Sequence, residues 1–436
     1  MMKSKILKYS IIYLLIILFL GSICLSFLFG VKIGLLRKDP LFSKVIEVYN
    51  LSQNFKLEIN KIFNKKRIQA VSNSLDYKDK KNNFKLKNNL EKFNGSVPNQ
   101  FTILTSLSVW EDDEVKHKLV FISDKEIIHE INLQEIQTVS KNNDIYKWPH
   151  GLIIDDEHFI YYNFDGGNSI TKKDICGKTI WTAEGNFHHL MSLNDEFIWA
   201  LRKKRFGDYD IAEEFVKINK FSGNVVYSFN VRDIIVANQP YDYFSIKQRD
   251  LSSLWEYEPF HFNDIDVLTE EFSDYFESFK QGDLMISSRS LNSIYIIDQN
   301  TLKIKKILFG LTRRQHDPDW NKGYISIYDN QTEWKDGKRY EKSRIVKVLG
   351  ALEQNLETLK FDVDFISDAR GNHEILEIDN LKYTLITSPY EGKLLLFKNE
   401  KNIFTLFNKQ KSDVLPISNG KILNKENFQY SLNLCK

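Results

Sequence analysis

The sequence predicts an all-β protein whose main domain is a six-bladed β-propeller. From residue 101 onward, short runs of Ile, Leu, Val, Phe and Tyr alternate with turns about every 8 to 15 residues, a spacing typical of antiparallel strands. The 31 Phe and 20 Tyr residues favour strands over helices. Five histidines stand near the start of such runs, where a propeller places the strand that lines its channel. They are His150, His189, His261, His316 and His373.

The strand-like runs group into six units, and each unit accounts for one blade. The units cover residues 101–131, 151–183, 189–231, 261–309, 315–361 and 371–408. A four-stranded blade explains the recurring polar start, whereas a solenoid or a sandwich would not place histidine at the same point of successive units. Residues 232–259 form a long insertion between the third and fourth units, and we expect it to lie over one face of the propeller.

The N-terminal segment predicts a membrane anchor. Residues 9–31 carry no charged side chain, and at about 1.5 Å per residue a helix of this length crosses a hydrocarbon layer of ~30 Å. Lys3, Lys5 and Lys8 precede it, which favours an N-terminus in the cytoplasm. The apolar stretch is longer than that of a cleaved signal peptide. We therefore expect a single-pass anchor with its flanks over residues 1–38, and the propeller on the periplasmic or another extracytoplasmic side.

Residues 39–96 predict a helical stalk and a polar linker, and residues 97–436 the propeller domain. Apolar residues between Leu41 and Ile62 recur at spacings of four and three, which is typical of an amphipathic helix. This helix either forms a coiled coil that joins copies of the chain into a homo-oligomer or packs against its own domain. Residues 73–94 are rich in Lys, Asn and Asp and favour a linker.

Composition excludes several classes of function. The net charge of +2 gives no electrostatic footprint for nucleic acid. The sequence has no Gly-rich phosphate loop, which argues against nucleotide donors and nicotinamide cofactors. Three cysteines exclude a disulfide scaffold. Cys24 lies in the anchor, and a bridge between Cys176 and Cys435 remains an open alternative that fits an oxidising compartment.

Four motifs near strand starts could carry chemistry. They are Phe187-His188-His189, His261-Phe262-Asn263-Asp264, the segment from Ser287 through Arg289 to Asn292, and the segment from Arg313 through His316 to Asp319. Each motif alone is explained by packing or by an ion pair. Together they supply imidazoles, a carboxamide and a guanidinium, which suit a tetrahedral oxyanion such as sulfate. A neutral imidazole can also attack sulfur as a nucleophile.

At these residues the chain resembles the arylsulfotransferase family. The resemblance rests on PHGLIIDD from Pro149, NFHHL from Asn186, FHFNDIDVL from Phe260 and RQHDPDW from Arg314, in this order. It implies a six-bladed propeller enzyme that moves a sulfuryl group between phenols without a nucleotide donor. It also implies an aryl sulfate and a phenolic acceptor as partners, with no cofactor and no metal.

The resemblance assigns roles to the motif residues. His316 is implied to be a nucleophile that becomes transiently sulfated, and Arg289 and Asn263 to hold the sulfuryl oxygens. His261 is implied to act as acid or base at the phenol oxygen. One of His188 and His189 matches the remaining family histidine, and we prefer His189 as the catalytic one. The residues expected to bind substrate are His188, His150, Asn292 and Asp264.

Two features depart from the family pattern, and two other functions stay open. Soluble periplasmic members lack the anchor, and Asp317 and Asp319 would repel an anionic ester unless they point away or pair with Arg313 and Arg314. One alternative is a metal site, although the guanidinium of Arg289 would repel the cation. Its ligands would be His150, His189, His261 and His316. The other alternative is a membrane-tethered scaffold propeller without turnover.

Overall fold

The computed structural model describes the propeller region of the chain. It covers residues 93–435 apart from 112–113, 135–147, 165–166, 207–209, 242, 244–259, 332–333, 336–337, 340, 350–354, 411–412 and 434. The predicted anchor at 1–38 and nearly all of the predicted stalk and linker at 39–96 lie outside the described residues. Within the described ranges, no helix has the length and apolar character needed to cross a membrane.

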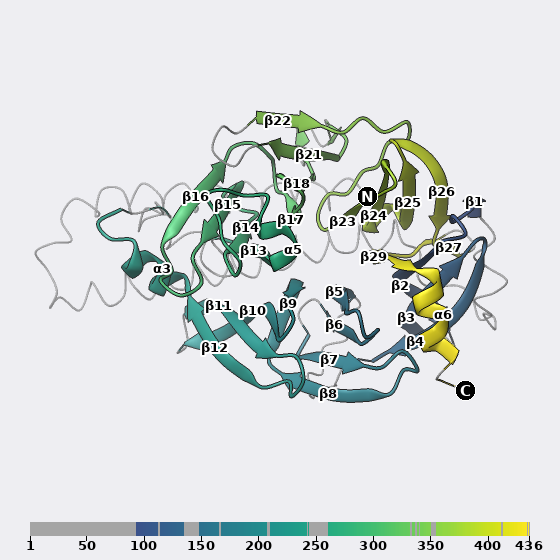
Figure 1. Ribbon diagram of the computed structural model, residues 1–436, viewed down its shortest axis with the longest axis horizontal. Helices are drawn as coiled ribbons and strands as arrows, with labels where there is room; N and C mark the ends of the chain where they lie inside the picture. The colour runs from purple at the N-terminus through teal and green to yellow at the C-terminus, as the bar shows by residue number, and fades with distance from the viewer. Residues whose placement is uncertain are drawn as a thin grey trace, which may run out of the picture. The chain divides into compact units, whose positions relative to one another are not determined.

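Five four-stranded antiparallel sheets and one five-stranded sheet surround one axis and confirm the predicted six-bladed propeller (Figure 1). From the axis outward the first three blades are β29 (Ile417–Asn424), β2 (Phe101–Glu111), β3 (Glu114–Ser123) and β4 (Glu126–Leu133); β5 (Pro149–Ile154), β6 (Ile160–Phe164), β7 (Ser169–Lys173) and β8 (Thr179–Glu184); β9 (Asn186–Leu193), β10 (Phe197–Phe206), β11 (Asp210–Asn219) and β12 (Val225–Asn230).

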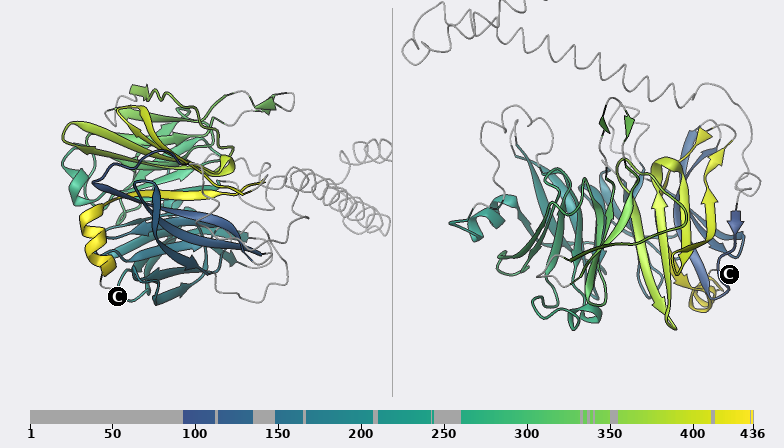
Figure 2. Two further views of the ribbon diagram at one scale, coloured as in Figure 1. Left: turned by 90° about the vertical axis from the view of Figure 1, so that its right-hand side faces the viewer. Right: turned by 90° about the horizontal axis from the view of Figure 1, so that it is seen from above.

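The other three blades follow the same order. They are β13 (Phe262–Val267), β14 (Leu284–Ser288), β15 (Ser293–Ile297) and β16 (Ile304–Phe309); β17 (His316–Trp320), β18 (Tyr324–Asp329), β21 (Arg344–Leu349) and β22 (Asn355–Thr358); β23 (Asn372–Ile378), β24 (Leu381–Ser388), β25 (Lys393–Lys398) and β26 (Lys401–Phe407), with β1 (Phe93–Gly95) on the outer edge. Seen edge on, the strands run between the two faces of the ring (Figure 2).

Short elements connect or extend the blades. They are the ribbons β19 (Trp334–Lys335) with β20 (Lys338–Arg339) and β27 (Lys409–Gln410) with β28 (Asp413–Val414), the helices α3 (Val231–Ala237), α5 (Glu270–Ser273) and α6 (Lys425–Asn433), and the 3-10 turn η3 (Pro389–Glu391). Helix α3 starts the predicted insertion, and the side chain of Asn230 caps it by accepting from the backbone N–H of Arg232 and Asp233. Residues 244–259 of the insertion lie outside the described residues, so its position over a face stays a prediction.

The ring closes through the C-terminal strand. β29 pairs with β2 and supplies the inner strand of the first blade, which the predicted unit 101–131 does not contain. Helix α6 then packs on this blade, with the ring of Phe428 stacked on that of Phe121 at 4.6 Å. Cys176 and Cys435 form a disulfide with Cα atoms 5.3 Å apart at a sequence separation of 259, which is the bridge that the sequence left open.

Apolar side chains of neighbouring blades pack face to face and leave the inner strands for polar residues. In one such core, Leu201 and Phe215 of the third blade meet Ile265 and Ile286 of the fourth, and all four are almost fully buried. Because the middle strands are covered on both faces, they read as nearly continuous apolar runs. The inner strands alternate, so Ile265 of β13 packs in this core while its neighbours Asp264 and Asp266 can face the axis.

Candidate active site

Histidines from four blades gather at the start of the inner strands. The ring of His189 lies 4.7 Å from that of His150, 4.9 Å from that of His188 and 5.1 Å from that of His261, between centroids. His316 is close enough for the charges of His150 and His261 to affect its pKa. We call these five residues the histidine cluster. The structure thus brings together all the histidines predicted for the site.

β-Bulges position the cluster. Pairing between the first and second strands shifts register at the start of β5, β9, β13, β17 and β29. The extra residues include His150, His189, Asn263 and Asp317. His189 and Asp317 have positive φ angles of 61° and 50°, a left-handed conformation that few non-glycine residues adopt. A bulge re-aims the side chains around it, so strand alternation alone does not say which residues face the axis.

Arg289 joins the cluster through His261. Its Nη1 lies 3.2 Å from Nε2 of His261, and because a guanidinium only donates, this nitrogen of the imidazole accepts. Burial first, and the guanidinium second, lower the pKa of His261 to about 3. His261 is therefore neutral near pH 7, and its Nε2 carries no proton that could pass to a leaving phenolate.

His316 is held in one tautomer. Asn330 donates through Nδ2 to the carbonyls of Ser367 (3.0 Å) and Arg370 (2.7 Å), so its Oδ1 accepts from Nδ1 of His316 at 2.7 Å. The lone pair then lies on Nε2, which accepts from the backbone N–H of Arg370 at 3.0 Å. Burial first, and Arg289 second, lower the pKa of His316 well below its usual value. A neutral imidazole with a defined acceptor atom results, although that atom is engaged by Arg370.

The two adjacent histidines of the third blade have different partners. His189 stands among the other imidazoles of the cluster, whereas His188 lies behind it with Nδ1 2.6 Å from Nδ1 of His189 and Nε2 3.0 Å from Oε2 of Glu213. Burial first, and then His150 and His188, lower the pKa of His189 well below its usual value. Of the two candidates, His189 is the one whose ring borders His150 and His261.

Three other predicted residues have mainly structural contacts or lie elsewhere. Nδ2 of the fully buried Asn263 donates to the carbonyl of Gln315 at 2.6 Å, which ties the fourth blade to the fifth. Oδ1 of Asn292 accepts from the backbone N–H of Arg314 at 2.8 Å and so links the turn after Arg289 to the segment before β17. Asp264 is not in the cluster but lines a cavity further along the inner strands.

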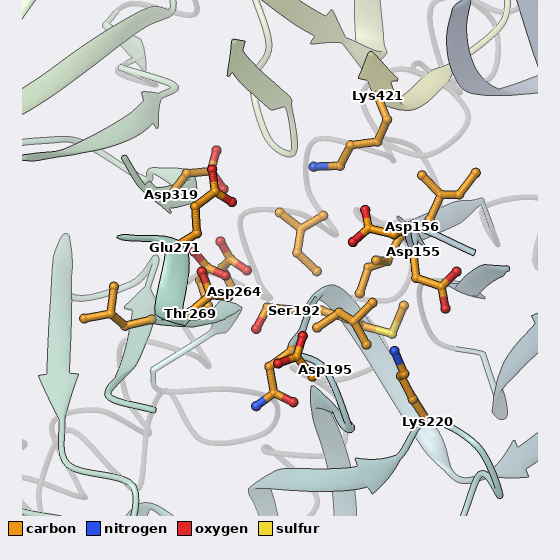
Figure 3. A pocket seen from close by; sticks show the side chains of 18 of the residues that line it. Asp155, Asp156, Ser192, Asp195, Lys220, Asp264, Thr269, Glu271, Asp319 and Lys421 are labelled. Atoms are coloured by element: carbon orange, nitrogen blue, oxygen red, sulfur yellow. The ribbon is translucent and has the colours of Figure 1, made fainter. Parts of the chain in front are cut away.

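That cavity has a volume of about 810 Å³, and we call it the acidic cavity. Asp266 lines it, as do Asp155, Asp195, Asp264, Asp319 and Lys421, which Figure 3 shows around the cavity. Burial first, and Asp317 second, raise the pKa of Asp264 well above its usual value. Burial alone would lower the pKa of Lys421, but Glu374 and the aspartates raise it above its usual value. The carboxylates thus share Lys421 as a counter-charge.

Asp317 turns away from His316. Its Oδ1 accepts from Asn372 at 2.9 Å, and its Oδ2 accepts from Nδ1 of His373 at 2.8 Å. Asp319 lies 3.6 Å from Nε2 of His373. Of the two ways in which a site for an anionic ester could tolerate these carboxylates, the structure has the one in which they point away. His373 consequently joins the carboxylates and not the histidine cluster.

The metal alternative receives no support from ligand geometry. Across the part of the chain that is described, the one group of three or more candidate ligands with atoms within 4.8 Å of one another is Asp317, Asp319 and His373. The set proposed for a histidine-ring metal does not form such a group. In the group that does, His373 already hydrogen-bonds Asp317 and, at 2.7 Å, Ser326.

Sequence reasoning missed several residues that fix the cluster. Asn330 ends the string YISIYDN, and its role appears only when Ser367 and Arg370 from the next blade are in place. Glu213 sits in a run of strand residues beside Glu214, and nothing in that run separates the two carboxylates. Alternation places neighbouring strand residues on opposite faces, but the sequence does not say which face meets His188.

These features define a class of protein, a six-bladed propeller that gathers neutral imidazoles and a guanidinium around its axis, a set of groups suited to binding and transferring an oxyanion. A sequence model of the family described as arylsulfotransferase (ASST) matches residues 150–409, more than half of the chain. The chain therefore belongs to the arylsulfotransferase family, as the resemblance implied. Family membership supports a sulfotransferase activity.

Other comparisons show less. Comparison with curated proteins found no significant match. Among solved structures, a protein of unknown function from Bacteroides caccae is 10% identical with a TM-score of 0.47, over 75% of this chain and 100% of that one. A streptogramin B lyase is 12% identical with a TM-score of 0.37, over 72% of this chain and 97% of that one. Because the identities and TM-scores are low, we draw no argument from these likenesses.

Proposed function

We propose that the protein transfers a sulfuryl group from an aryl sulfate to a phenolic acceptor through a sulfated His316. The observation that carries the proposal is the buried, neutral His316 with its tautomer held by Asn330 and with Arg289 near enough to lower its pKa. A nucleophilic imidazole must be neutral, and a nearby guanidinium can stabilise the charge on sulfuryl oxygens. Membership of the arylsulfotransferase family supports the same chemistry.

In the first half-reaction Nε2 of His316 attacks sulfur, the bond from sulfur to the aryl oxygen breaks, and the aryl oxygen departs with the bonding electrons as a phenolate. The imidazole becomes cationic as the bond forms, and Oδ1 of Asn330 stabilises the proton that stays on Nδ1. The hydrogen bond that Nε2 accepts from the N–H of Arg370 at 3.0 Å must first break. Once sulfur is bound there, that N–H is placed to donate to a sulfuryl oxygen.

In the second half-reaction an acceptor phenol attacks the sulfur and His316 leaves in its original tautomer. Arg289 serves as a donor in both steps, and its contact with His261 at 3.2 Å fixes the position of the guanidinium. Asn263 has a second amide proton beyond the one bound by Gln315 and is proposed to hold another sulfuryl oxygen. Both half-reactions then use the same donors, as a ping-pong transfer requires.

The experiment is to incubate the purified full-length protein with 4-nitrophenyl sulfate and a phenol, to follow nitrophenolate release, and to locate the added sulfuryl group by mass spectrometry. We expect the label on His316 and loss of transfer in His316→Asn. The matched control is His129→Asn, because His129 lies outside the cluster and contacts the carbonyl of Ile175 at 2.8 Å. A panel of aryl sulfates that gives neither nitrophenolate nor a labelled histidine refutes the transferase and leaves a scaffold propeller.

We also propose that residues 9–31 anchor the protein in a membrane and that the propeller lies on the extracytoplasmic side. The apolar stretch supports this, as does the disulfide between Cys176 and Cys435, because disulfides persist in oxidising compartments. Protease added to intact cells should digest the propeller once the layers outside the anchoring membrane are made permeable, while that membrane stays intact. Removal of the stalk at 39–96 tests by sedimentation whether it joins copies of the chain.

A further inference from the structure

The proposed transfer needs a place for one proton, and neither His261 nor His316 offers it. A phenol loses its proton when it attacks the sulfated histidine, and a departing phenolate must regain one. His261 accepts from Arg289 and has a pKa lowered to about 3, chiefly by burial and then by that guanidinium. His316 is the proposed nucleophile. Of the other three, His189 is the central one, because its ring borders those of His150, His188 and His261.

His189 is the first member of a hydrogen-bonded chain that leads away from the cluster. Nδ1 of His189 lies 2.6 Å from Nδ1 of His188, and Nε2 of His188 lies 3.0 Å from Oε2 of Glu213. All three side chains are at least nine-tenths buried. Glu213 reaches His188 from β11, the third strand of the same blade, and its Oε1 makes no hydrogen bond within the described residues.

The donors and acceptors of these hydrogen bonds can be assigned by starting from Glu213. A carboxylate only accepts, so His188 donates from Nε2 to Glu213. With that proton on Nε2, Nδ1 of His188 is left as the acceptor of the hydrogen bond from Nδ1 of His189. The neutral His189 therefore has its lone pair on Nε2, the ring nitrogen on the opposite side from His188. This tautomer makes Nε2 of His189 a base for a group bound in the cluster.

A positive charge that stayed on His189 would be costly. Burial and the charges of His150, His188, His261 and His316 all lower the pKa of this residue. The hydrogen bonds from His189 through His188 to Glu213 avoid this free-energy cost, because a proton that enters at Nε2 of His189 is matched by one that leaves toward Glu213. The charge then ends on a carboxyl group, which becomes neutral, and no cation is added beside Arg289.

We propose that His189, His188 and Glu213 form a relay that stores the phenolic proton between the two half-reactions; the inference rests on the proposed function. When the acceptor attacks, its O–H bond breaks and the proton goes to Nε2 of His189. The proton on Nδ1 of His189 passes to Nδ1 of His188, and the proton on Nε2 of His188 passes to Glu213. In the next turnover the three transfers reverse and protonate the departing aryl oxygen. His188 and Glu213 are thus positioning residues.

The variant Glu213→Gln removes the site that stores the proton but keeps the hydrogen bond to His188. The amide oxygen of Gln can still accept from Nε2 of His188, but the side chain cannot take up the proton. The matched control is Glu214→Gln, since Glu214 is the next residue on β11, is equally buried, and binds Arg202 at 2.7 Å and not the cluster. Glu213→Asp keeps the acid and should rescue part of the activity.

The two half-reactions are measured separately by rapid quench of the full-length protein. With 4-nitrophenyl sulfate, whose leaving anion needs no proton, Glu213→Gln should still form labelled His316. Transfer from the labelled enzyme to phenol should fall about 10²-fold, the size of general acid–base catalysis, while Glu214→Gln transfers like the wild type. With phenyl sulfate as donor, labelling in Glu213→Gln should also slow.

The outcomes separate the two hypotheses. If the wild type is never labelled, the proposed function fails. If the wild type is labelled and Glu213→Gln returns the sulfuryl group to phenol as fast as Glu214→Gln, the relay is wrong and the function stands. Should Glu213→Gln not fold, nitrogen NMR of ¹⁵N-histidine in the wild type sulfated by phenyl sulfate decides, because the relay has then given up its proton and requires an unprotonated Nε2 on His189 and an unprotonated Nδ1 on His188. The opposite tautomers overturn it.

Discussion

The lowered pKa of His261 predicts that this residue makes the folded protein sensitive to acid. Burial and Arg289 hold the folded-state pKa at about 3, whereas an unfolded histidine titrates near about 6.5. Because the folded value is the lower one, His261 binds its proton first in the unfolded state as the pH falls. Its contribution to stability is therefore complete above about pH 6.5 and is lost progressively down to about pH 3.

The size of the effect follows from that difference. Each unit of pH in this window changes the free energy of unfolding by about 1.4 kcal/mol. Between pH 7.5 and pH 5.0 the contribution of His261 falls by about 2 kcal/mol. The loss is smaller than the whole pH interval would give, because it begins only as the pH approaches the unfolded pKa. The buried carboxylates act in the opposite direction, because burial raises the pKa of Asp266 to about 7. The pH dependence of the wild type's free energy of unfolding therefore does not isolate His261, and the wild type must be compared with a variant that lacks this histidine.

The assay is urea unfolding of the wild type and His261→Gln, followed by tryptophan fluorescence at several pH values. Between pH 7.5 and pH 5.0 the wild type should lose about 2 kcal/mol more than the variant. His129→Gln, a change outside the cluster, corrects for the loss of a histidine as such. Parallel curves for the wild type and His261→Gln would refute the reasoning, because His261 would then titrate alike in both states.

Two further changes test other parts of the structure. Asn330→Ala removes the hydrogen bonds to His316, Ser367 and Arg370 and should lower the free energy of unfolding by about 2 to 4 kcal/mol in urea, with slower sulfation of His316; an unchanged labelling rate would contradict the role of Asn330. Cys435→Ser opens the disulfide that spans 259 residues and should cost about 3 to 5 kcal/mol of stability, which the wild type should match after reduction; equal melting temperatures with and without reductant would contradict this.

Sequence periodicity was sufficient for the architecture, since runs such as Ser293–Ile297 carry their strand pattern openly. It also placed His150, His189, His261 and His316 together, because a propeller brings the starts of its inner strands to one place. It did not find β29, whose residues Ile417–Asn424 mix polar residues with Gly420 and resemble a loop.

The details of the site depended on contacts that local sequence does not encode. Bulges put Asn263 and Asp317 out of simple alternation, so one binds the carbonyl of Gln315 and the other faces His373. The partners of His316 and His188 come from distant segments, namely Asn330 with Arg370, and Glu213. Such pairings arise only after the blades have packed.

The strand that completes the ring also brings Lys421 to the axis. Asp264 and Asp266 stand on β13, Asp317 and Asp319 on β17, and a ribosome finishes all of these before it makes β29. Until the last strand docks, these carboxyl groups lack the lysine that favours their ionised form, and burial raises the pKa of Asp264 and of Asp319 well above the usual value. The docking of β29 and the ionisation of these carboxyl groups are therefore linked, because Lys421 lowers the pKa of Asp264 and Asp319 once it is in place.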